Sequence, residues 1–307
     1  MRNPIHDGKL GEILAAHHLW LESKSGGERA DLSGWNLSDR TLRGIGLRGA
    51  ILRSISVLDS DLNGADLSGT DLTGADFRNS SLAGADFSGA DLTQASLQYS
   101  GLAEANFTEA TLVLTELQKA NLRDSRLFEA RILSADLSFA NLRGAQLHHA
   151  RIRRANFSHA ELDGARFLRA RAEDSNFTAC RLDESDWTNA QAIGCSFHLS
   201  QGTGVRFSRA NLTRSFFGKA SLRLCNFSGA NLNGADFSWA DLFESRFGDA
   251  ETSGADFSRA NLLGARELSA RQLSLARTGE LTTLPNGQKG AFLRGSGAER
   301  PQRTAVF

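Results

Sequence analysis

The chain has 307 residues, and its 35 Lys and Arg balance its 35 Asp and Glu, so the formal net charge is zero. This balance disfavours both a globally basic nucleic-acid binder and an acidic, solvating polypeptide. Only 3 Pro, 1 Met and 1 Tyr stand against 30 Gly and 19 Phe, a bias that indicates a repeat protein. No apolar run is long enough to span a bilayer, the first residues lack the apolar core of a signal peptide, and 3 Cys make no disulfide framework. We therefore expect a cytoplasmic protein with no membrane association.

Residues 9–23 predict an amphipathic helix near the N-terminus. Its apolar stripe consists of Leu10, Ile13, Leu14, His17 and Leu21. Gly26 and Gly27 would end this helix. Because a stacked repeat exposes unpaired backbone at its ends, we assign residues 1–29 to a segment whose helix caps the first repeat.

From Leu32 to Leu262, a large apolar residue recurs at every fifth position without insertion or deletion. Of these 47 positions, 43 hold Leu, Phe, Ile, Val or Trp. A small residue stands two positions earlier, and a polar residue lies between, as in Ala65-Asp66-Leu67-Ser68-Gly69. A period of five fits neither a helix nor a simple strand. It predicts short extended sides joined by turns, with the large and small residues inward and the other three outward.

These A-[D/N]-L-x-G units resemble those of the pentapeptide-repeat proteins, and the resemblance covers roughly residues 30–265. It implies an all-β fold, a right-handed quadrilateral β-helix with four units and twenty residues per coil. The 47 units would then form nearly twelve coils, with short helical caps at both ends.

When the sequence is written in rows of twenty residues, its pattern supports this coil length independently of the family resemblance. The aromatic central residues fall in two opposite columns, which predicts ring stacking between adjacent coils. One column holds Phe157, Phe177, Phe197, Phe217, Phe237 and Phe257, and the other holds Phe167, Trp187, Phe207, Phe227 and Phe247.

One segment, centred on residues 188–204, departs from the rule. The large central residue is replaced at Ala172, Ala192 and Gly202. Trp187 could fill the space beside Ala172. Beside the other two we expect a bulge, a small void or an inward Ile193, and a ligand pocket is the alternative.

The repeat register breaks after Leu262, so we assign residues 30–265 to the solenoid. Residues 266–277 predict a helical cap that uses Leu268, Leu273 and Leu275, and residues 278–307 predict a flexible tail. A homodimer through the C-terminal cap is the alternative role of this end, as in some gyrase-protecting relatives.

No residue set predicts catalysis. The three cysteines, Cys180, Cys195 and Cys225, occupy the small inward slot at different corners and predict buried structural residues. No His, carboxylate and nucleophile combine, and no H-x-x-x-H or phosphate loop occurs. We expect no enzyme activity, no cofactor and no metal site.

Charge is segregated along the chain. Residues 61–120 carry nine acids against two cations, and residues 121–172 carry ten Arg against five acids. The basic candidate surface is the column Arg131, Arg151 and Arg171 with Arg153 and Arg154 beside it. It predicts binding of an anion or nucleic acid, and a merely solvated surface is the alternative.

The acidic candidate surface consists of Asp61, Asp66, Asp71, Asp76, Asp86 and Asp91. The resemblance implies a DNA mimic, because relatives that protect DNA gyrase from quinolones present a negative surface of duplex-like width. The net-zero total, the Arg-rich middle and the lack of loop insertions argue against this role.

The apolar candidate surface consists of Tyr99, Phe139, Leu199 and Trp239, which share one outward column. Our leading hypothesis is a non-catalytic, rigid solenoid that binds a macromolecule, most simply a protein, along one side. The alternatives are a DNA-mimic modulator of a type II topoisomerase (gyrase) and anion or nucleic-acid binding through the Arg131–Arg171 column.

Overall fold

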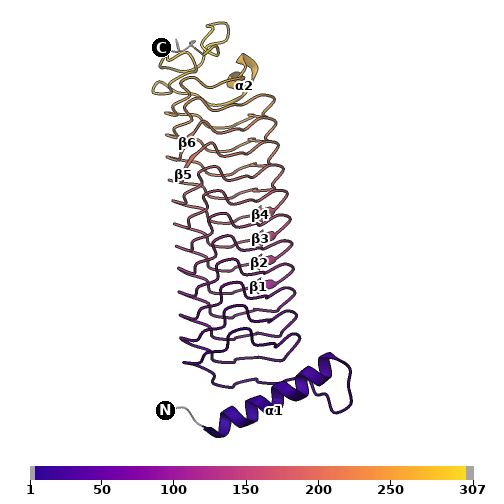
Figure 1. Cartoon of the computed structure of the whole chain (residues 1–307). Helices are drawn as coiled ribbons and strands as arrows, with labels where there is room; N and C mark the ends of the chain where they lie inside the picture. Colours follow the sequence, from indigo (N-terminus) through magenta and orange to yellow (C-terminus); the bar gives the residue numbers. More distant parts are fainter. Residues whose placement is uncertain (1–3, 302–307) are drawn as a thin grey trace, which may run out of the picture. The chain divides into compact units, whose positions relative to one another are not determined.

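The computed structural model describes residues 4–301. The chain forms two compact units, of which the first ends at Asp136 and the second begins at Leu137. Each unit is a stack of coils that repeat every twenty residues (Figure 1). The first unit contains helix α1 (Pro4–Leu21) and strands β1 (Thr111–Val113) and β2 (Arg131–Leu133). The second contains strands β3 (Arg151–Arg153), β4 (Arg171–Glu173), β5 (Gln201–Thr203) and β6 (Ser221–Arg223) and helix α2 (Ala270–Leu275).

Neighbouring coils pair as parallel strands. In the first unit Thr111 of β1 lies opposite Arg131 of β2, and in the second unit Arg151 of β3 lies opposite Arg171 of β4. Strands β5 and β6 pair in the same register. Isolated parallel bridges with the same offset continue the ladder within both units. The predicted coil of twenty residues is therefore confirmed.

Backbone hydrogen bonds show how five residues make one side of a coil, and the pentapeptide around Leu67 is typical. The N–H of Leu67 donates to the carbonyl of Asp86 in the next coil, at 2.8 Å. The chain then turns at Gly69, whose φ of 61° lies in the left-handed region. Ala65 and Leu67 are buried, whereas Asp66 is half-buried. The predicted inward and outward positions are confirmed.

Two columns of stacked rings fill the interior of the second unit. In one, Phe157, Phe177, Phe197, Phe217, Phe237 and Phe257 have successive centroids 4.6 to 5.3 Å apart. In the other, Trp187 stacks on Phe167 at 3.8 Å. Rings of the two columns meet edge to face. In the first unit, Phe87 and Phe107 stack at 4.8 Å. The predicted stacking is confirmed, and it adds to burial in holding the register.

A side chain from the next pentapeptide fills the gap at Gly202, in the irregular segment around residues 188–204. A Cβ added to Gly202 would lie 2.6 Å from Cγ2 of Val205, so Val205 occupies the place of the missing central side chain. Ile193 stays on the outer surface, half-buried, and the ladder passes through the segment without a bulge. The expectations of a bulge and of an inward Ile193 were wrong. The alternative of a ligand pocket required empty volume beside Gly202, and Val205 occupies that volume.

Helix α1 covers the open end of the first unit's coils (Figure 1). A buried histidine joins the helix to them. The Nδ1 of His17 accepts the backbone N–H of Ala30 at 3.1 Å, and its Nε2 lies 3.0 Å from the carbonyl oxygen of Arg48. A neutral ring protonated at Nε2 satisfies both groups. Burial lowers the pKa of His17 below its usual value, which favours this neutral form.

The rest of the α1 stripe is mostly as predicted. Leu10 is buried, and Ile13 and Leu14 are half-buried. Leu21 is exposed, because the helix ends there and the chain turns away. A Cβ at Gly27 would collide with the backbone of the last helical turn, so only glycine allows this close approach.

Helix α2 is fixed to the last coil of the second unit by polar bonds. Ser269 and Gln272 form a reciprocal capping box at its N-terminus. The side-chain amide Nε2 of Gln272 donates to the backbone carbonyls of Phe247 and Ala250, at 2.7 and 2.9 Å. The hydroxyl of Thr252 donates to the carbonyl of Gln272 at 2.8 Å. Thr252 therefore replaces a large apolar residue where the cap needs an anchor.

Two of the three leucines expected in this cap face the coils. Leu268 and Leu273 are buried. Leu275, in contrast, is 49% exposed at the end of α2. The homodimer predicted through this cap stays a prediction. The exposed Leu275 is an apolar side chain that such a dimer interface would contain.

The segment after α2 continues the packing of the second unit. Thr283 pairs with Asn261 as a further parallel bridge, and Leu284 is buried. The mobility predicted for the tail stays a prediction for residues 278–301. Residues 302–307 lie outside the described residues.

Candidate functional site

The six aspartates of the acidic candidate surface lie in the first unit, and each closes its own turn. In every case Oδ1 accepts the backbone N–H two residues later, at 2.8 to 3.2 Å. Asn side chains accept the same bond in other pentapeptides; for example, the Oδ1 of Asn121 accepts the backbone N–H of Arg123. The aspartates are therefore required first by the turn, because a short side-chain acceptor at this position mimics a backbone turn bond.

Arginines neutralise half of the acidic surface. Asp61 pairs with Arg43, Asp71 with Arg53 and Asp76 with Arg78. The hydrogen bond from Arg78 holds the pKa of Asp76 below its usual value. The other three, Asp66, Asp86 and Asp91, form no ion pair with any side chain in the range 8–301.

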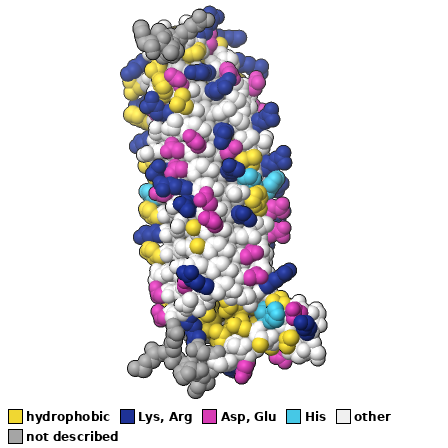
Figure 2. Space-filling view, in the orientation of Figure 1, with side chains coloured by type: hydrophobic (Ala, Val, Ile, Leu, Met, Phe, Trp, Pro, Cys, Tyr) yellow, Lys and Arg dark blue, Asp and Glu magenta, His cyan; other side chains and the backbone are white. Residues whose placement is uncertain are grey.

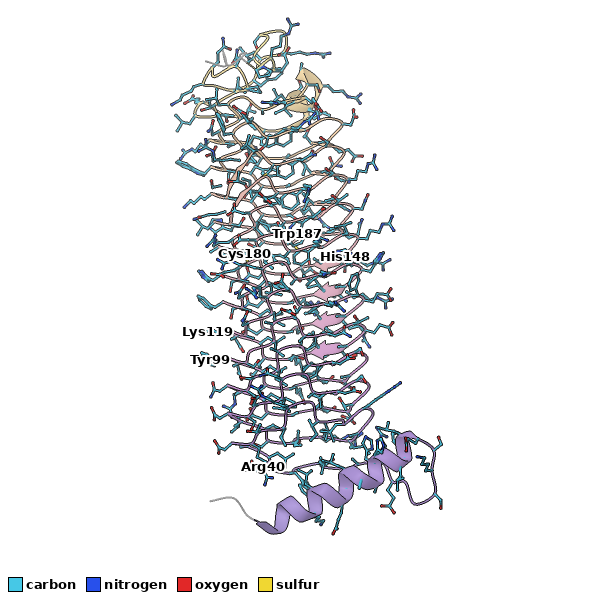
Figure 3. The ribbon with its side chains drawn as sticks, viewed as in Figure 1. Arg40, Tyr99, Lys119, His148, Cys180 and Trp187 are labelled. Atoms are coloured by element: carbon cyan, nitrogen blue, oxygen red, sulfur yellow. The ribbon has the colours of Figure 1, made fainter. Side chains whose placement is uncertain are left out.

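The apolar candidate residues are all exposed, by 47% to 58%. Tyr99 belongs to the first unit, where the ammonium of Lys119 lies 5.2 Å from its ring centroid (Figure 3). The other three belong to the second unit and stand in one column, joined by backbone bonds between successive coils. We call this column the corner ridge: Phe139, His159, Ala179, Leu199, Lys219, Trp239 and Arg259.

Aromatic and cationic groups pair along the corner ridge. The rings of Phe139 and His159 stack with centroids 4.7 Å apart. The guanidinium of Arg259 lies 4.5 Å from the ring centroid of Trp239. Every ridge residue has a positive φ, from 56° to 63°. Figure 2 shows apolar, acidic and basic side chains interspersed over one face of the molecule.

The basic candidate residues divide between the units. Arg131 lies on β2 of the first unit, whereas Arg151 and Arg153 lie on β3, and Arg171 on β4, of the second unit. Arg154 follows β3 at a left-handed turn, with a φ of 52°. All five side chains are exposed. The structure thus brings Arg151 and Arg171 directly opposite each other on paired strands.

The three cysteines are buried structural residues, as predicted. Their thiols donate to the carbonyl of the central residue of the preceding coil, as Cys195 does to Ala172. Burial raises the pKa of each thiol to about 12, so they are poor nucleophiles at neutral pH. Figure 3 shows Cys180 and Trp187 inside the coils.

Hollows lie beside both caps. One of about 680 Å³ is lined by residues of the α1 end, including Trp20, and by Arg48 and Asp66. One of about 630 Å³ lies between α2 and the last coils, where Glu267 pairs with Arg246. Among the side chains of residues 8–301, no three His, Cys, Asp or Glu gather to hold a metal ion. No helix within residues 4–301 is long and apolar enough to cross a membrane.

The repeat is matched by a family profile described as pentapeptide repeats, in eight copies. The matched ranges are 60–98, 92–127, 130–167, 206–242 and 235–266, more than half of the chain. The chain belongs to the pentapeptide repeat family. Its fold is the family's right-handed quadrilateral β-helix, as the sequence resemblance implied.

Solved structures of other pentapeptide repeat proteins are similar to this chain. HetL of Nostoc sp. strain PCC 7120, described as involved in heterocyst differentiation regulation, is 28% identical, over 68% of this chain and 89% of HetL, with a TM-score of 0.46. A protein of the Arabidopsis thaliana thylakoid lumen is 34% identical over 31% of this chain and 70% of its own, with a TM-score of 0.30. QnrB1, a plasmid-mediated fluoroquinolone resistance protein, is 19% identical over 76% and 82%, with a TM-score of 0.22. A search of curated proteins found no significant match.

Sequence reasoning missed several surface residues of this pentapeptide repeat protein. Phe216 and Leu224 are 52% and 51% exposed but were not singled out. Arg169, Arg209 and Arg214 were missed as well, and they lie on the side of the second unit that contains β3 and β4 or at the corner before it. The rows of twenty residues already contained the signal for these arginines, because residues twenty apart stack in one column.

Proposed function

We propose that this pentapeptide repeat protein is a non-catalytic binding protein, and that the corner ridge of its second unit holds a protein partner. The observation that carries the proposal is the residue type at the ridge. Phe139, Leu199 and Trp239 are about half exposed and adopt a backbone conformation that bulky L-residues rarely take.

This choice of residues costs stability. A left-handed conformation costs an L-residue on the order of 1–2 kcal/mol, and glycine and asparagine avoid most of it. Some other corners of the second unit use glycine, such as Gly144, Gly164 and Gly234, whereas most of the rest hold polar or charged residues and one holds Leu224. A chain selected for stability alone would use glycine or asparagine on the ridge as well. The strained aromatic and aliphatic residues therefore favour a role in recognition.

The ridge also indicates the chemistry of its partner. Its titratable residues are His159, Lys219 and Arg259, and it carries no carboxylate between Phe139 and Arg259. Exposed Trp and Phe beside cations match the residue types that dominate protein interfaces. We infer that the partner presents an apolar surface flanked by acidic groups.

The test compares affinity capture by the full-length protein with capture by the double variant Leu199→Asn/Trp239→Asn, using lysate of the native host and quantitative mass spectrometry. Asparagine tolerates the left-handed backbone, so the fold should persist. A partner captured by the wild type should fall at least about tenfold with the variant, as expected for the loss of two buried hot-spot residues.

Leu224→Asn is the matched control, because Leu224 is also half exposed at a left-handed corner but lies outside the ridge. Partners should be retained by this control. Equal capture by all three proteins, or equal loss in the control, would refute the ridge as the binding site.

DNA mimicry of a type II topoisomerase substrate is the second candidate. Asp66, Asp86 and Asp91 favour it, because their carboxylates have no cationic partner among the side chains of residues 8–301 and stand in the acidic part of the first unit. The bonds from these carboxylates to their own turns do not remove their charge.

A supercoiling assay with purified DNA gyrase tests this candidate, with and without a quinolone. The protein should change supercoiling, and Asp66→Asn/Asp86→Asn should abolish the effect, since asparagine keeps the turn bond and removes the charge. Asp61→Asn/Asp71→Asn is the control, because arginines already neutralise these two carboxylates. An unchanged supercoiling rate with wild-type protein would reject mimicry.

A further inference from the structure

One side of the second unit carries seven exposed arginines. It comprises the outward positions of the side that contains β3 and β4, together with the corner before it, from residue 149 to residue 214. We call it the basic side. Its arginines are Arg151, Arg153, Arg154, Arg169, Arg171, Arg209 and Arg214.

These arginines differ from most others of the same unit in having no acidic partner. None of the seven forms an ion pair with a side chain in the range 8–301. In contrast, Arg143, Arg181, Arg206, Arg223, Arg246, Arg266 and Arg277 all pair with a carboxylate. Most arginines elsewhere in this unit therefore have a carboxylate partner among these described side chains, although Arg166, Arg259, Arg271 and Arg294 do not, whereas none of the seven on the basic side has one.

The backbone holds the unpaired charges close together. Arg151 and Arg171 are Cα partners on parallel strands, where neighbouring chains lie about 4.8 Å apart. Like charges directly opposite each other repel. The side chain of Arg209 passes over Gly229, whose added Cβ would lie 3.2 Å from Arg209 Cγ. Only two acids, Glu173 and Asp174, share the basic side, so its local charge is strongly positive.

The chemistry of the side chains identifies the anion. All the permanent cations are arginines, whose planar guanidinium donates two parallel hydrogen bonds to a phosphate. No Phe, Tyr or Trp occupies an outward position of the basic side, so it offers no aromatic platform for bases. Recognition would then depend on the repeating backbone phosphates and not on base identity.

We propose that the basic side of the second unit binds the phosphodiester backbone of single-stranded nucleic acid, without base specificity. A flexible single strand can follow a series of charges placed one coil apart on a flat surface, whereas a duplex is stiff. This surface is separate from the corner ridge: its columns contain none of the ridge residues. The proposal therefore does not depend on a protein partner at the ridge.

The experiment measures fluorescence anisotropy of labelled oligothymidine of about twenty nucleotides, longer than the site size of roughly 4–16 nucleotides of single-strand binding folds. Full-length wild type is compared with Arg151→Gln/Arg171→Gln. The control, Arg206→Gln/Arg246→Gln, removes the same charge from arginines that are already ion-paired. Titrations run from about 50 to about 200 mM salt, and poly-glutamate and a duplex of the same length serve as competitors.

The basic-side variant should bind at least about tenfold more weakly, and its slope of log affinity against log salt should fall by about 1.4, or ~0.7 for each lost phosphate contact. The control should change affinity less than about threefold, because its arginines are occupied. Equal losses in both variants would overturn the proposal, since net charge alone would then explain binding. No binding at the lowest salt would overturn it too, as would tighter competition by poly-glutamate or by the duplex.

Discussion

At Gly202 and Val205 the usual side-chain sizes of two inward positions are reversed, and this reversal predicts how substitutions there change the free energy of unfolding. In a regular unit the central position is large and the slot two residues earlier is small. Here the central position is Gly202, and the next small slot holds Val205, whose Cγ2 fills the space. The backbone of Gly202 is not in the left-handed region, so only packing opposes a side chain there.

Gly202→Ala should destabilise the second unit by overpacking. The added Cβ would lie 2.6 Å from Val205 Cγ2 and 3.0 Å from Leu182 Cβ. Overpacking of this kind costs about 1–3 kcal/mol. Val205→Ala removes two buried carbons, for a transfer loss of about 1.6 kcal/mol at ~0.8 kcal/mol per carbon. The remaining cavity adds to that loss.

The double variant Gly202→Ala/Val205→Ala should recover most of this cost, because the new methyl enters the space that the valine leaves. We expect a favourable coupling of at least about 1 kcal/mol between the two substitutions. Denaturant midpoints of all four proteins, followed by tryptophan fluorescence, measure it, since Trp187 lies buried in the same unit. Additive effects of the two single substitutions would refute this exchange of side-chain volume.

Three shorter predictions test the cap, the core and the ridge. The stabilising contribution of neutral His17 is present above about pH 6.5, its ordinary pKa, and is lost as pH falls through its lowered folded pKa. The protection factors of the α1 amides, which are exchange rates corrected for the intrinsic rate at each pH, should therefore fall on acidification, and His17→Gln should reduce that dependence. Iodoacetamide at neutral pH should alkylate Cys180, Cys195 and Cys225 only after denaturation, because burial raises their thiol pKa to about 12, and labelling of the native protein would contradict this. Leu199→Asn should leave the melting temperature unchanged or raise it by the equivalent of up to about 1 kcal/mol, and a clear fall would contradict the strain assigned to the ridge.

The sequence predicted the interior well because the interior is periodic. A residue such as Leu67 is buried by its own position in the unit and by copies of that unit above and below. Its environment can therefore be read from the local pattern alone. The exceptions occur where two successive pentapeptides compensate each other's side-chain volume, as at Gly202 and Val205. The sequence pattern of one pentapeptide does not show which neighbour supplies the missing volume.

The ends of the repeat were predicted less completely. The stripe on α1 identified His17 as inward, but its bonds to Ala30 and Arg48 depend on how the helix crosses the first coils. The apolar pattern likewise predicted an inward Leu275, which is exposed because it is the last residue of α2, a helix of only 6 residues. The polar anchor Gln272 carries no hydrophobic signal at all.

The charged surfaces show a different limit. Counting acids gave Asp61 and Asp66 equal weight, yet Asp61 is paired with Arg43, which stands eighteen residues earlier, whereas Asp66 has no such partner among the side chains of residues 8–301. Whether a cation reaches a given carboxylate depends on side-chain direction across coils. The position of a residue within the twenty-residue coil predicts which side chains of adjacent coils lie near it. Only the structure shows whether a cation and a carboxylate form an ion pair.

The same turn chemistry explains why recognition surfaces can differ from side to side on one fold. Folding requires the inward pair of each unit and a short acceptor, Asp or Asn, at many first positions. The remaining outward positions make few bonds that hold the coil, so strained aromatics at Trp239 and unpaired cations at Arg171 are both compatible with the register. It follows that substitutions at outward positions should change binding by one side while stability and the other side stay unchanged, and this independence is what allows the ridge and the basic side to be tested separately.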